Sequence, residues 1–264
     1  MLGEYAVLDG GPALVAAVDR GVMCTVTDGD AIETPGDDSF VRAALRTIGA
    51  PRARYHFEDW NPTELPGKGG FGGSAAAVVA ACIAGGCEDV ETMVAIHRSV
   101  QGSGSGMDVR ASASGGIRRY QRASISEALP GVPLLAVWSG NSARTGPRVE
   151  RYLAHADRED FVRRSVELVD GFSQDPVASL EAAFENLVAM SERAGIDYLT
   201  PGHRRIAELA RAQGGAAKPS GAGGGDVAVA LFASEDSRRD FARACALEGL
   251  LPVPVRIIDG VHDA

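Results

Sequence analysis

An α+β fold divided into two lobes is the architecture that the sequence predicts. Strand-like segments fill the first half around a central pair of helical segments, whereas the second half holds helices followed by a strand, a helix and a strand. The chain changes character near residue 130, so we expect lobes over residues 1–132 and 133–264. A length of 264 residues is sufficient for two hydrophobic cores, and no internal repeat is present.

The first lobe is expected to begin with a strand end that enters a turn at residues 9–12, where Asp, Gly, Gly and Pro follow one another. Helical spacing of apolar residues predicts a helix at 39–48 with Ser39 as a possible cap, and alanine-rich composition predicts a buried helix at 74–84. The other expected elements are strands at 13–18, 22–26 and 52–57, a helix at 89–101, and a hairpin over 112–120 around Gly115 and Gly116.

The second lobe is expected to open with an apolar strand at 133–138. Three helical segments follow, a glycine-rich loop comes next, and a strand–helix–strand unit ends the chain. The helical segments are near 147–171, 176–193 and 201–213, and the closing unit comprises a strand at 227–232, a helix at 236–247 and a strand at 253–258.

The charge balance limits the classes of partner. A net charge of −9 and a pI near 5.1 argue against nonspecific binding of nucleic acid and against an anionic membrane surface. An anionic substrate would therefore need a local cluster of positive charge. The scattered histidines at 56, 155, 203 and 262 are predicted to lie on the surface.

Cysteine usage and the lack of long apolar runs indicate the compartment. Cys24, Cys82, Cys87 and Cys245 form no CxxC pair, so no zinc site is expected, and Cys82 and Cys87 are predicted to be small core residues. No signal-peptide pattern and no run of ~18 apolar residues occurs. We expect a reduced, cytoplasmic, soluble protein.

Three glycine-rich stretches carry most of the polar chemistry. We call residues 66–76 the first glycine loop, residues 102–108 the second and residues 218–226 the third. Glycine lets main-chain N–H groups approach a phosphate closely because no Cβ intervenes. Three such loops in one chain predict several backbone walls around a single anion.

The first glycine loop runs directly into the helix that begins at Ser74. A helix N-terminus offers unpaired N–H groups and a positive dipole end, so it favours phosphate. Ser74 could cap the helix or turn its hydroxyl to a Mg²⁺ ion, and a purely structural reading is close packing of the helix. The GxGxxG match in this loop follows no apolar strand, and no GxxxxGK[ST] occurs, which excludes the dinucleotide and P-loop motifs.

The second glycine loop delivers a single carboxylate, Asp108. Such a group can accept a proton from a substrate hydroxyl, hold a metal, or cap a helix. The third loop contains Lys218, Ser220 and four glycines around Ala222, a density that a structural turn rarely needs.

Together these segments resemble the GHMP kinase superfamily, which includes galactokinase, homoserine kinase, mevalonate kinase and phosphomevalonate kinase. Residues 3–14 are similar to its first motif, residues 66–76 to its second, written PxxxGLGSSAA, and residues 218–226 to its third. The likeness covers nearly the whole chain in the right order. It is most like bacterial-type phosphomevalonate kinases, whose HRxxQG…GSGxDV pattern matches residues 97–109.

The resemblance implies a fold and a set of site residues. The fold would be a two-lobed GHMP kinase fold, with an amino-terminal lobe like domain 2 of ribosomal protein S5 and a ferredoxin-like carboxy-terminal lobe. The first N-terminal strand, with its APGK-like lysine, is expected to be missing. Catalytic roles fall to Asp108 and Lys68, ATP binding to Gly70, Gly72, Gly73, Ser74 and Ala75, and Mg²⁺ binding to Ser74. Substrate binding falls to Glu4, Tyr5, Ser105, Arg144, Thr145, Lys218, Ser220, Gly221, Ala222 and Gly223.

The implied reaction is direct phosphoryl transfer from ATP to 5-phosphomevalonate. Its acceptor is already ionised at neutral pH, so positioning and electrostatics would carry most of the rate. The implied partner is a small phosphorylated acid, with no nucleic acid or membrane, and the protein would be a monomer or homodimer.

Three further departures from the family pattern keep alternatives open. Gly73 replaces the first serine of GLGSS, His97 lies nearest to a metal-binding glutamate of mevalonate kinases, and Arg144 replaces a serine of TGxxAST. The alternatives are a mevalonate or small-sugar kinase, and a nucleotide-binding protein of this fold with weak or no catalysis.

Overall fold

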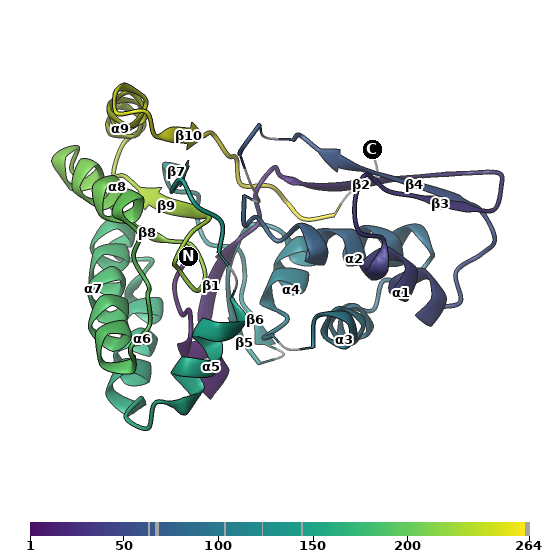
Figure 1. Ribbon diagram of the computed structural model, residues 1–264, viewed down its shortest axis with the longest axis horizontal. Helices are drawn as coiled ribbons and strands as arrows, with labels where there is room; N and C mark the ends of the chain where they lie inside the picture. Colours follow the sequence, from purple (N-terminus) through teal and green to yellow (C-terminus); the bar gives the residue numbers. More distant parts are fainter. Residues whose placement is uncertain (63, 67–68, 103, 123, 144, 262–264) are drawn as a thin grey trace. The chain divides into compact units, whose positions relative to one another are not determined.

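The computed structural model describes residues 1–62, 64–66, 69–102, 104–122, 124–143 and 145–261, and it confirms the predicted α+β class (Figure 1). The chain forms two compact units. Unit 1 comprises Met1–Val15, Thr63–Gly70 and Ile117–Arg256, and unit 2 comprises Ala16–Pro62, Phe71–Gly116 and Ile257–Ala264. Each unit thus collects stretches that are distant in sequence. The lobe division predicted between residues 132 and 133 stays a prediction.

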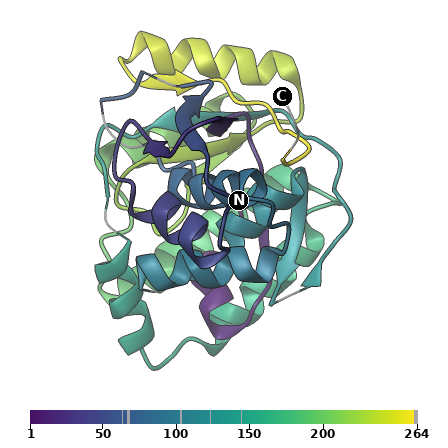
Figure 2. The ribbon, with the colours of Figure 1, turned by 90° about the vertical axis from the view of Figure 1, so that its right-hand side faces the viewer.

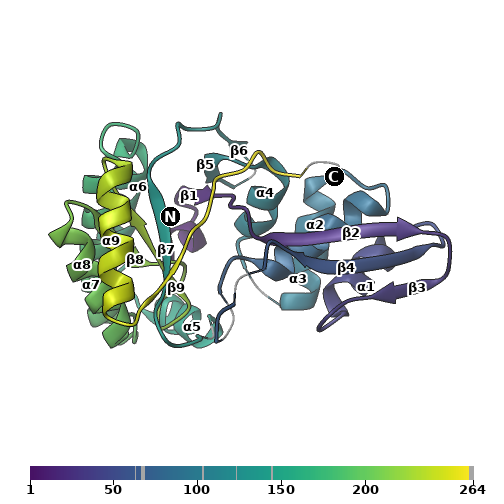
Figure 3. The ribbon, with the colours of Figure 1, turned by 90° about the horizontal axis from the view of Figure 1, so that it is seen from above.

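Unit 2 contains a three-stranded sheet whose long strands run side by side in Figure 3. Its strands are β2 (Gly21–Thr27), β3 (Ala31–Glu33) and β4 (Arg54–Trp60), in the order β2-β4-β3. β4 pairs antiparallel with β2 and parallel with β3. In β4, Tyr55 and Phe57 are buried while their neighbours along the strand are exposed. This period of two means that one face of the sheet packs against helices and the other faces solvent.

Four helices complete unit 2, and α2 contacts the other three as well as β2. The helices are α1 (Ser39–Thr47), α2 (Gly73–Ala84), α3 (Val90–Gln101) and α4 (Met107–Ser114). α2 consists almost entirely of small and apolar residues, and Ala75, Val78 and Ala81 on it have no exposed surface. A helix that is apolar on all sides is stable only when it is buried, which is why α2 occupies the core.

Unit 1 is organised around an antiparallel sheet of order β10-β7-β9-β8. Its strands are β7 (Leu134–Trp138), β8 (Ala216–Pro219), β9 (Val227–Leu231) and β10 (Leu251–Val253). Helices α8 (Pro201–Ala212) and α9 (Glu235–Leu247), the latter the yellow helix of Figure 2, share a core with this sheet. Ile206 and Phe241 meet alternate strand residues such as Val137 there, so both helices cover one face.

A second core in unit 1 joins the start of the chain to the helical segment. Tyr5, Tyr152, Phe161 and Phe184 are buried in this core. The elements involved are the 3₁₀ helix η1 (Ala6–Asp9) and helices α5 (Gly146–Ala154), α6 (Glu159–Gly171) and α7 (Pro176–Ala194). A further small sheet has the order β1-β5-β6, formed by β1 (Ala13–Ala16), β5 (Ile117–Gln121) and β6 (Ser124–Ile125).

The predicted hairpin over 112–120 is wrong. Residues up to Ser114 belong to α4, and the glycine pair ends that helix before β5 begins. Gly115 has a φ of 67°, and a Cβ there would lie 1.9 Å from the Gly260 nitrogen. Gly115 is therefore required for close backbone approach within unit 2, and the glycine pair does not form a two-strand turn.

Other differences concern short or strained segments. The single helix predicted at 147–171 is two helices. Between them the Arg158 side chain donates to the carbonyls of Leu153 and His155. Residues 6–9 form η1 in place of a strand end, and β3 and β8 were not predicted. Ser39 does not cap α1: Asp38 holds the cap position, and the Asp37 carboxylate accepts the Ser39 N–H. The last strand is β10 at 251–253, with one isolated bridge further on at Ile257.

The remaining predicted helices and strands are present within a few residues. Cys82 has no exposed surface and Cys87 packs partly buried against the same core, as predicted, and all four cysteines are free thiols. No helix within the described ranges is both long and apolar enough to cross a bilayer.

Candidate active site

The end of the first glycine loop forms the N-terminus of α2 in unit 2. Gly72 occupies the cap position with a φ of 76°, a left-handed conformation that glycine adopts without a Cβ penalty, and no described side chain caps the helix. Gly73 is exposed, and a Cβ built on it would meet no atom within 4 Å. The first amides of α2 are therefore open to an anion, which the helix dipole also favours.

Ser74, in the first turn of α2, is tied to α3. Its Oγ lies 3.1 Å from Nε2 of His97, a buried residue whose ring stacks on Phe40 at a centroid distance of 5.2 Å. Burial lowers the pKa of His97 below its usual value, and the nearby Asp108 carboxylate opposes that shift. A neutral imidazole can accept the serine proton or donate its own, so His97 sets the orientation of this hydroxyl.

Asp108 reaches the same place from the second glycine loop. It lies in the first turn of α4, and its Cβ would be 3.7 Å from a Cβ on Gly72. The residue is exposed, and partial desolvation by the surrounding protein raises the pKa of Asp108, while the nearby His97 lowers it. Unit 2 thus brings a carboxylate, a hydroxyl and open helix amides together.

The second glycine loop is held in shape by α3. The Arg98 guanidinium donates to the carbonyls of Gly104 at 3.1 Å and Ser105 at 2.8 Å. Gly106 has a φ of 75°, and a Cβ there would approach Val94 to 2.7 Å. The hydroxyl of Ser105 accepts from the Met107 N–H at 3.4 Å, so it is engaged within the loop.

The third glycine loop connects β8 to β9 in unit 1. Gly221, Gly223 and Gly224 have φ values of 70°, 73° and 76°, all in the left-handed region. A Cβ on Gly223 would lie 2.3 Å from the Tyr198 ring, and one on Gly224 would lie 1.8 Å from the Arg148 guanidinium. The Gly224 N–H donates to the Tyr198 carbonyl at 2.7 Å. Protein groups therefore pack directly onto this loop.

The first motif of the chain supports the third glycine loop. Nζ of Lys218 lies 2.5 Å from Oε1 of Glu4 and also donates to the Pro219 carbonyl at 2.8 Å. The Tyr5 hydroxyl donates to the carbonyl of Ala222 at 2.7 Å. Residues that were predicted to bind substrate therefore form hydrogen bonds and an ion pair with one another. Their contact with an acceptor stays a prediction.

Asp226 closes the third loop and contacts two other segments of unit 1. Its N–H donates to the carbonyl of Asn141 at 2.6 Å, and its Oδ1 accepts the Ala143 N–H at 3.3 Å. A Cβ on Gly70 would lie 2.9 Å from the Asp226 Cβ. The start of the first glycine loop and the end of the third are neighbours in unit 1.

The predicted site residues fall into two groups. Lys68 and Arg144 lie outside the described residues. In unit 2 are Gly72, Gly73, Ser74, Ala75, Ser105 and Asp108. In unit 1 are Glu4, Tyr5, Gly70, Thr145, Lys218, Ser220, Gly221, Ala222 and Gly223. Ala75 has no exposed surface, whereas Thr145 is exposed. A single cradle that includes both groups stays a prediction.

Several residues around these loops had no role assigned from the sequence. Tyr198 and Arg148 carry no motif signal, because their roles arise from packing on glycines distant in sequence, and Asp226 ends the third motif but had no assigned role. His97 was visible in the HRxxQG pattern and lacked an assigned role. The surface prediction for His203 is wrong: it is 1% exposed and forms a capping box with Thr200 at the start of α8. His56 is exposed as predicted, and His262 lies outside the described residues.

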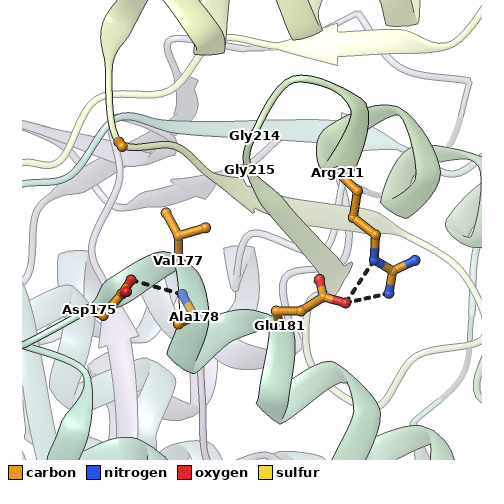
Figure 4. Close-up of a pocket in the computed structure, with 8 residues that line it drawn as sticks. Asp175, Val177, Ala178, Glu181, Arg211, Gly214 and Gly215 are labelled. Atoms are coloured by element: carbon orange, nitrogen blue, oxygen red, sulfur yellow. Dashed lines mark hydrogen bonds and ion pairs between the residues drawn. The ribbon is translucent and has the colours of Figure 1, made fainter.

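A surface pocket of unit 1 lies elsewhere. It has a volume of 520 Å³ between the start of α7 and the end of α8, where Asp175 caps α7 and Arg211 pairs with Glu181 (Figure 4). None of its lining residues is a predicted site residue, and its charged groups are engaged with one another or with helix amides. We therefore place no chemistry there. Within the described ranges, no cluster of three His, Cys, Asp or Glu side chains could hold a metal ion.

Comparisons with known proteins show what the chain resembles in sequence and fold. Residues 172–249 match the family of GHMP kinases C terminal. The phosphomevalonate kinase of Streptomyces sp. strain CL190 is 26% identical, over 96% of this chain and 93% of that protein. A Listeria innocua structure superposes with a TM-score of 0.83 at 22% identity, covering 98% of this chain and 96% of that one. Streptococcus pneumoniae phosphomevalonate kinase in complex with phosphomevalonate and AMPPNP gives 0.76 at 21%, covering 97% and 96%.

The chain has the fold of the GHMP kinases, and its residues 172–249 match their C-terminal family. At such low identity the two structural neighbours are evidence for the fold only. The Streptomyces relative adds similarity in sequence. Within the superfamily the chain resembles phosphomevalonate kinases over nearly its whole length. The resemblance drawn from the three glycine loops is confirmed.

Proposed function

We propose that this protein is an ATP-dependent phosphomevalonate kinase, which transfers the γ-phosphoryl group of ATP to the phosphate of 5-phosphomevalonate. The product is a diphosphate ester, and the reaction belongs to the mevalonate route to isoprenoids. Support comes from the curated relative of that name and from a neighbouring structure that holds both phosphomevalonate and an ATP analogue.

The observation that carries the proposal is the open N-terminus of α2 beside Asp108. The main chain at Gly73 is accessible to phosphate oxygens, because Gly73 is exposed and a Cβ built on it would meet no atom within 4 Å. A carboxylate beside a phosphate site would repel the anion unless a cation lies between them. The combination therefore suits a nucleotide that arrives with a divalent cation.

The oxygen groups around Gly72 fit Mg²⁺. Hydroxyl and carboxylate oxygens are hard ligands of the kind that this ion prefers, and Ser74 and Asp108 supply one of each. Mg²⁺, when bound, neutralises charge on the transferring phosphoryl group. Ser74 would hold it with its hydroxyl, which His97 orients at 3.1 Å. Asp108 would orient the acceptor or complete the charge balance, and no base is needed for an acceptor that is already ionised.

Charge on the acceptor requires cations. We assign this role to Lys68 and Arg144, whose side chains lie outside the described residues, and the main chain of residues 220–223 would bind the acceptor's polar groups. We further propose a cytoplasmic protein, monomeric or a homodimer, in which the four thiols remain reduced.

The test is ADP release with Mg-ATP and a panel of acceptors comprising 5-phosphomevalonate, mevalonate and galactose. We expect turnover with 5-phosphomevalonate and little with either alcohol. In Asp108→Ala, kcat should fall by about 100- to 1,000-fold, because a charge that acts on the transition state is lost. Asp28→Ala, which changes an exposed turn residue of unit 2, should keep the wild-type rate.

Turnover with an alcohol alone would replace the proposal with a mevalonate or sugar kinase. Tight ATP binding by calorimetry without turnover on any acceptor would indicate a nucleotide-binding protein without catalysis. Full activity in Asp108→Ala would remove that residue from the reaction.

A further inference from the structure

The ion pair between Glu4 and Lys218 is closed off from solvent. Their side chains are 10% and 0% exposed, respectively. Lys218 Nζ is shared between Oε1 of Glu4 at 2.5 Å and the Pro219 carbonyl at 2.8 Å. To touch a soluble acceptor, the ammonium would have to leave both partners and expose a buried carboxylate, which is strongly unfavourable.

The ammonium also contacts the main chain at the start of the third glycine loop. Lys218 and Pro219 are both the last residues of β8 and the first residues of that loop. Lys218 therefore fixes the first peptide of the loop to Glu4, a residue near the start of the chain.

The residue after Glu4 makes a second contact with the third glycine loop. Tyr5 is 4% exposed, and its hydroxyl donates to the Ala222 carbonyl in the middle of the loop at 2.7 Å. Consecutive residues of the first motif thus hold the beginning and the middle of the third glycine loop. Between these two points the main chain has few remaining degrees of freedom.

We propose that Glu4 and Lys218 are positioning residues, which set the conformation of the third glycine loop, and that neither contacts the phosphorylated acceptor. The loop's main chain then binds the acceptor in an arrangement fixed before substrate arrives, which lowers the ordering cost of binding. This inference rests on the proposed function, and it separates residues that touch substrate from residues that shape the loop.

The two charges must act as a unit. Oε2 of Glu4 is buried and has no hydrogen-bond partner among the described residues. Oε1 lies 2.5 Å from Nζ of Lys218 and 3.9 Å from the amino-terminal nitrogen of Met1, so Lys218 supplies the closer compensating charge. Removing Glu4 leaves the buried ammonium of Lys218 without a carboxylate, and removing Lys218 leaves Glu4 with only the longer contact, whereas removing both removes both charges. A coupled pair is therefore expected to show strongly non-additive effects.

The test compares Glu4→Gln, Lys218→Met and the double variant. The matched control is Arg205→Met with Glu248→Gln, which removes an exposed ion pair of the same unit. Hydrogen–deuterium exchange of residues 219–226 is measured without substrate. Both single variants should exchange at least about tenfold faster there, and the double variant should be no faster than the worse single. The control pair should leave this exchange unchanged.

Kinetics supply the second criterion. If the pair positions the loop, Glu4→Gln and Lys218→Met should both lower kcat/KM for the acceptor by similar factors, with KM for ATP changed less than about threefold. The overturning result is a raised acceptor KM in Lys218→Met alone, with unchanged exchange at 219–226 and additive effects in the double variant.

Two provisions keep the outcome decisive. If Lys218→Met does not fold, Glu4→Asp is used instead, because it keeps the charge and shortens the side chain by one methylene. Unchanged hydrogen–deuterium exchange at residues 219–226 in that variant overturns the proposal. If the wild-type protein fails to phosphorylate 5-phosphomevalonate, the proposed function is lost, but the exchange measurement still tests the positioning role without any substrate.

Discussion

The first and third glycine loops use the same residue type for opposite purposes. At the third loop in unit 1, a Cβ on Gly223 or Gly224 would collide with Tyr198 or Arg148 at 2.3 Å and 1.8 Å. At the end of the first loop, which lies in unit 2, a Cβ on Gly73 would meet nothing within 4 Å, and one on Gly72 would meet only Asp108 at ordinary contact distance. Gly223 and Gly224 of the third loop make room for protein, and Gly72 and Gly73 of the first leave room for a ligand.

Glycine density alone therefore does not identify the contact surface for phosphate. A loop packed by aromatic and guanidinium groups is fixed before binding, whereas an open helix N-terminus is accessible and acquires its partner on binding. We therefore expect nucleotide phosphates to bind at the start of α2 and the third loop to act as a preformed support.

The largest expected effect tests the packing at the third loop. Gly223→Ala should lower the free energy of unfolding by about 2–5 kcal/mol. The loss has two causes: alanine disfavours a left-handed φ, and its Cβ would overpack against Tyr198. Gly221→Ala is the matched control: its φ of 70° is similar but a Cβ there has no neighbour within 4 Å. It should cost only about 1–2 kcal/mol. Equal losses in urea unfolding would show that packing does not distinguish the two positions.

The next effect concerns acid stability near the third loop. Burial, with the positive charges of Lys218 and Arg148, lowers the pKa of His203 to about 4. The unfolded chain binds a proton near pH 6.5 and the folded chain does not, so stability falls as pH drops from 6.5 towards 4, by up to about 3 kcal/mol. His203→Gln keeps an acceptor for the capping box and should flatten this decline.

The control for that measurement is His56→Gln, which changes an exposed histidine and should leave the pH dependence as it is. Unfolding by urea is followed at several pH values between 7 and 4. An unchanged slope in His203→Gln would mean that other groups cause the acid sensitivity. His97 beside the first loop contributes with the same sign, since burial also lowers its pKa.

The smallest change in stability is expected at the first loop. Gly73→Ala places a Cβ in open space at the first residue of a helix, so stability should change by less than about 1 kcal/mol, in the stabilising direction. Nucleotide affinity should nevertheless fall about three- to tenfold, because the methyl group enters space that phosphate would occupy. Calorimetry with an ATP analogue measures the change.

Gly146→Ala is the matched control, since Gly146 also begins a helix and has no neighbour within 4 Å of a Cβ position. Its nucleotide affinity should match that of the wild type. Equal affinity in Gly73→Ala would place the phosphates away from the start of α2.

Local sequence was sufficient for most helices and for the order of elements. α3 was predicted from apolar spacing, and its N-terminal Asp89 accepts the Thr92 N–H at 2.9 Å, as a capping aspartate should. Cys82 was predicted to be buried from its alanine-rich surroundings. These features depend on neighbours within one or two helical turns, which a sequence shows directly.

Features that depend on distant residues could not be predicted in this way. α4 is short and flanked by glycines, and it is fixed to α3 by the Arg110 guanidinium, which binds both carboxylate oxygens of Glu91 at 2.6 and 2.8 Å. β8 contains no β-branched residue and exists because β9 pairs with it. The burial of Lys218 needs a partner whose position only the folded chain reveals. The resemblance to known motifs identified the loops. It could not show which loop residues pack against protein and which are open to a ligand.

The separation of Glu4 and Lys218 has a consequence for biosynthesis. The two residues are 214 positions apart, so the ribosome adds Lys218 long after Glu4. At ribosomal rates of about 5–20 residues per second, that interval is roughly 10–40 s. During synthesis the amino-terminal segment must stay hydrated. Closure of this long-range contact then belongs among the late events of folding, after the local helices have formed.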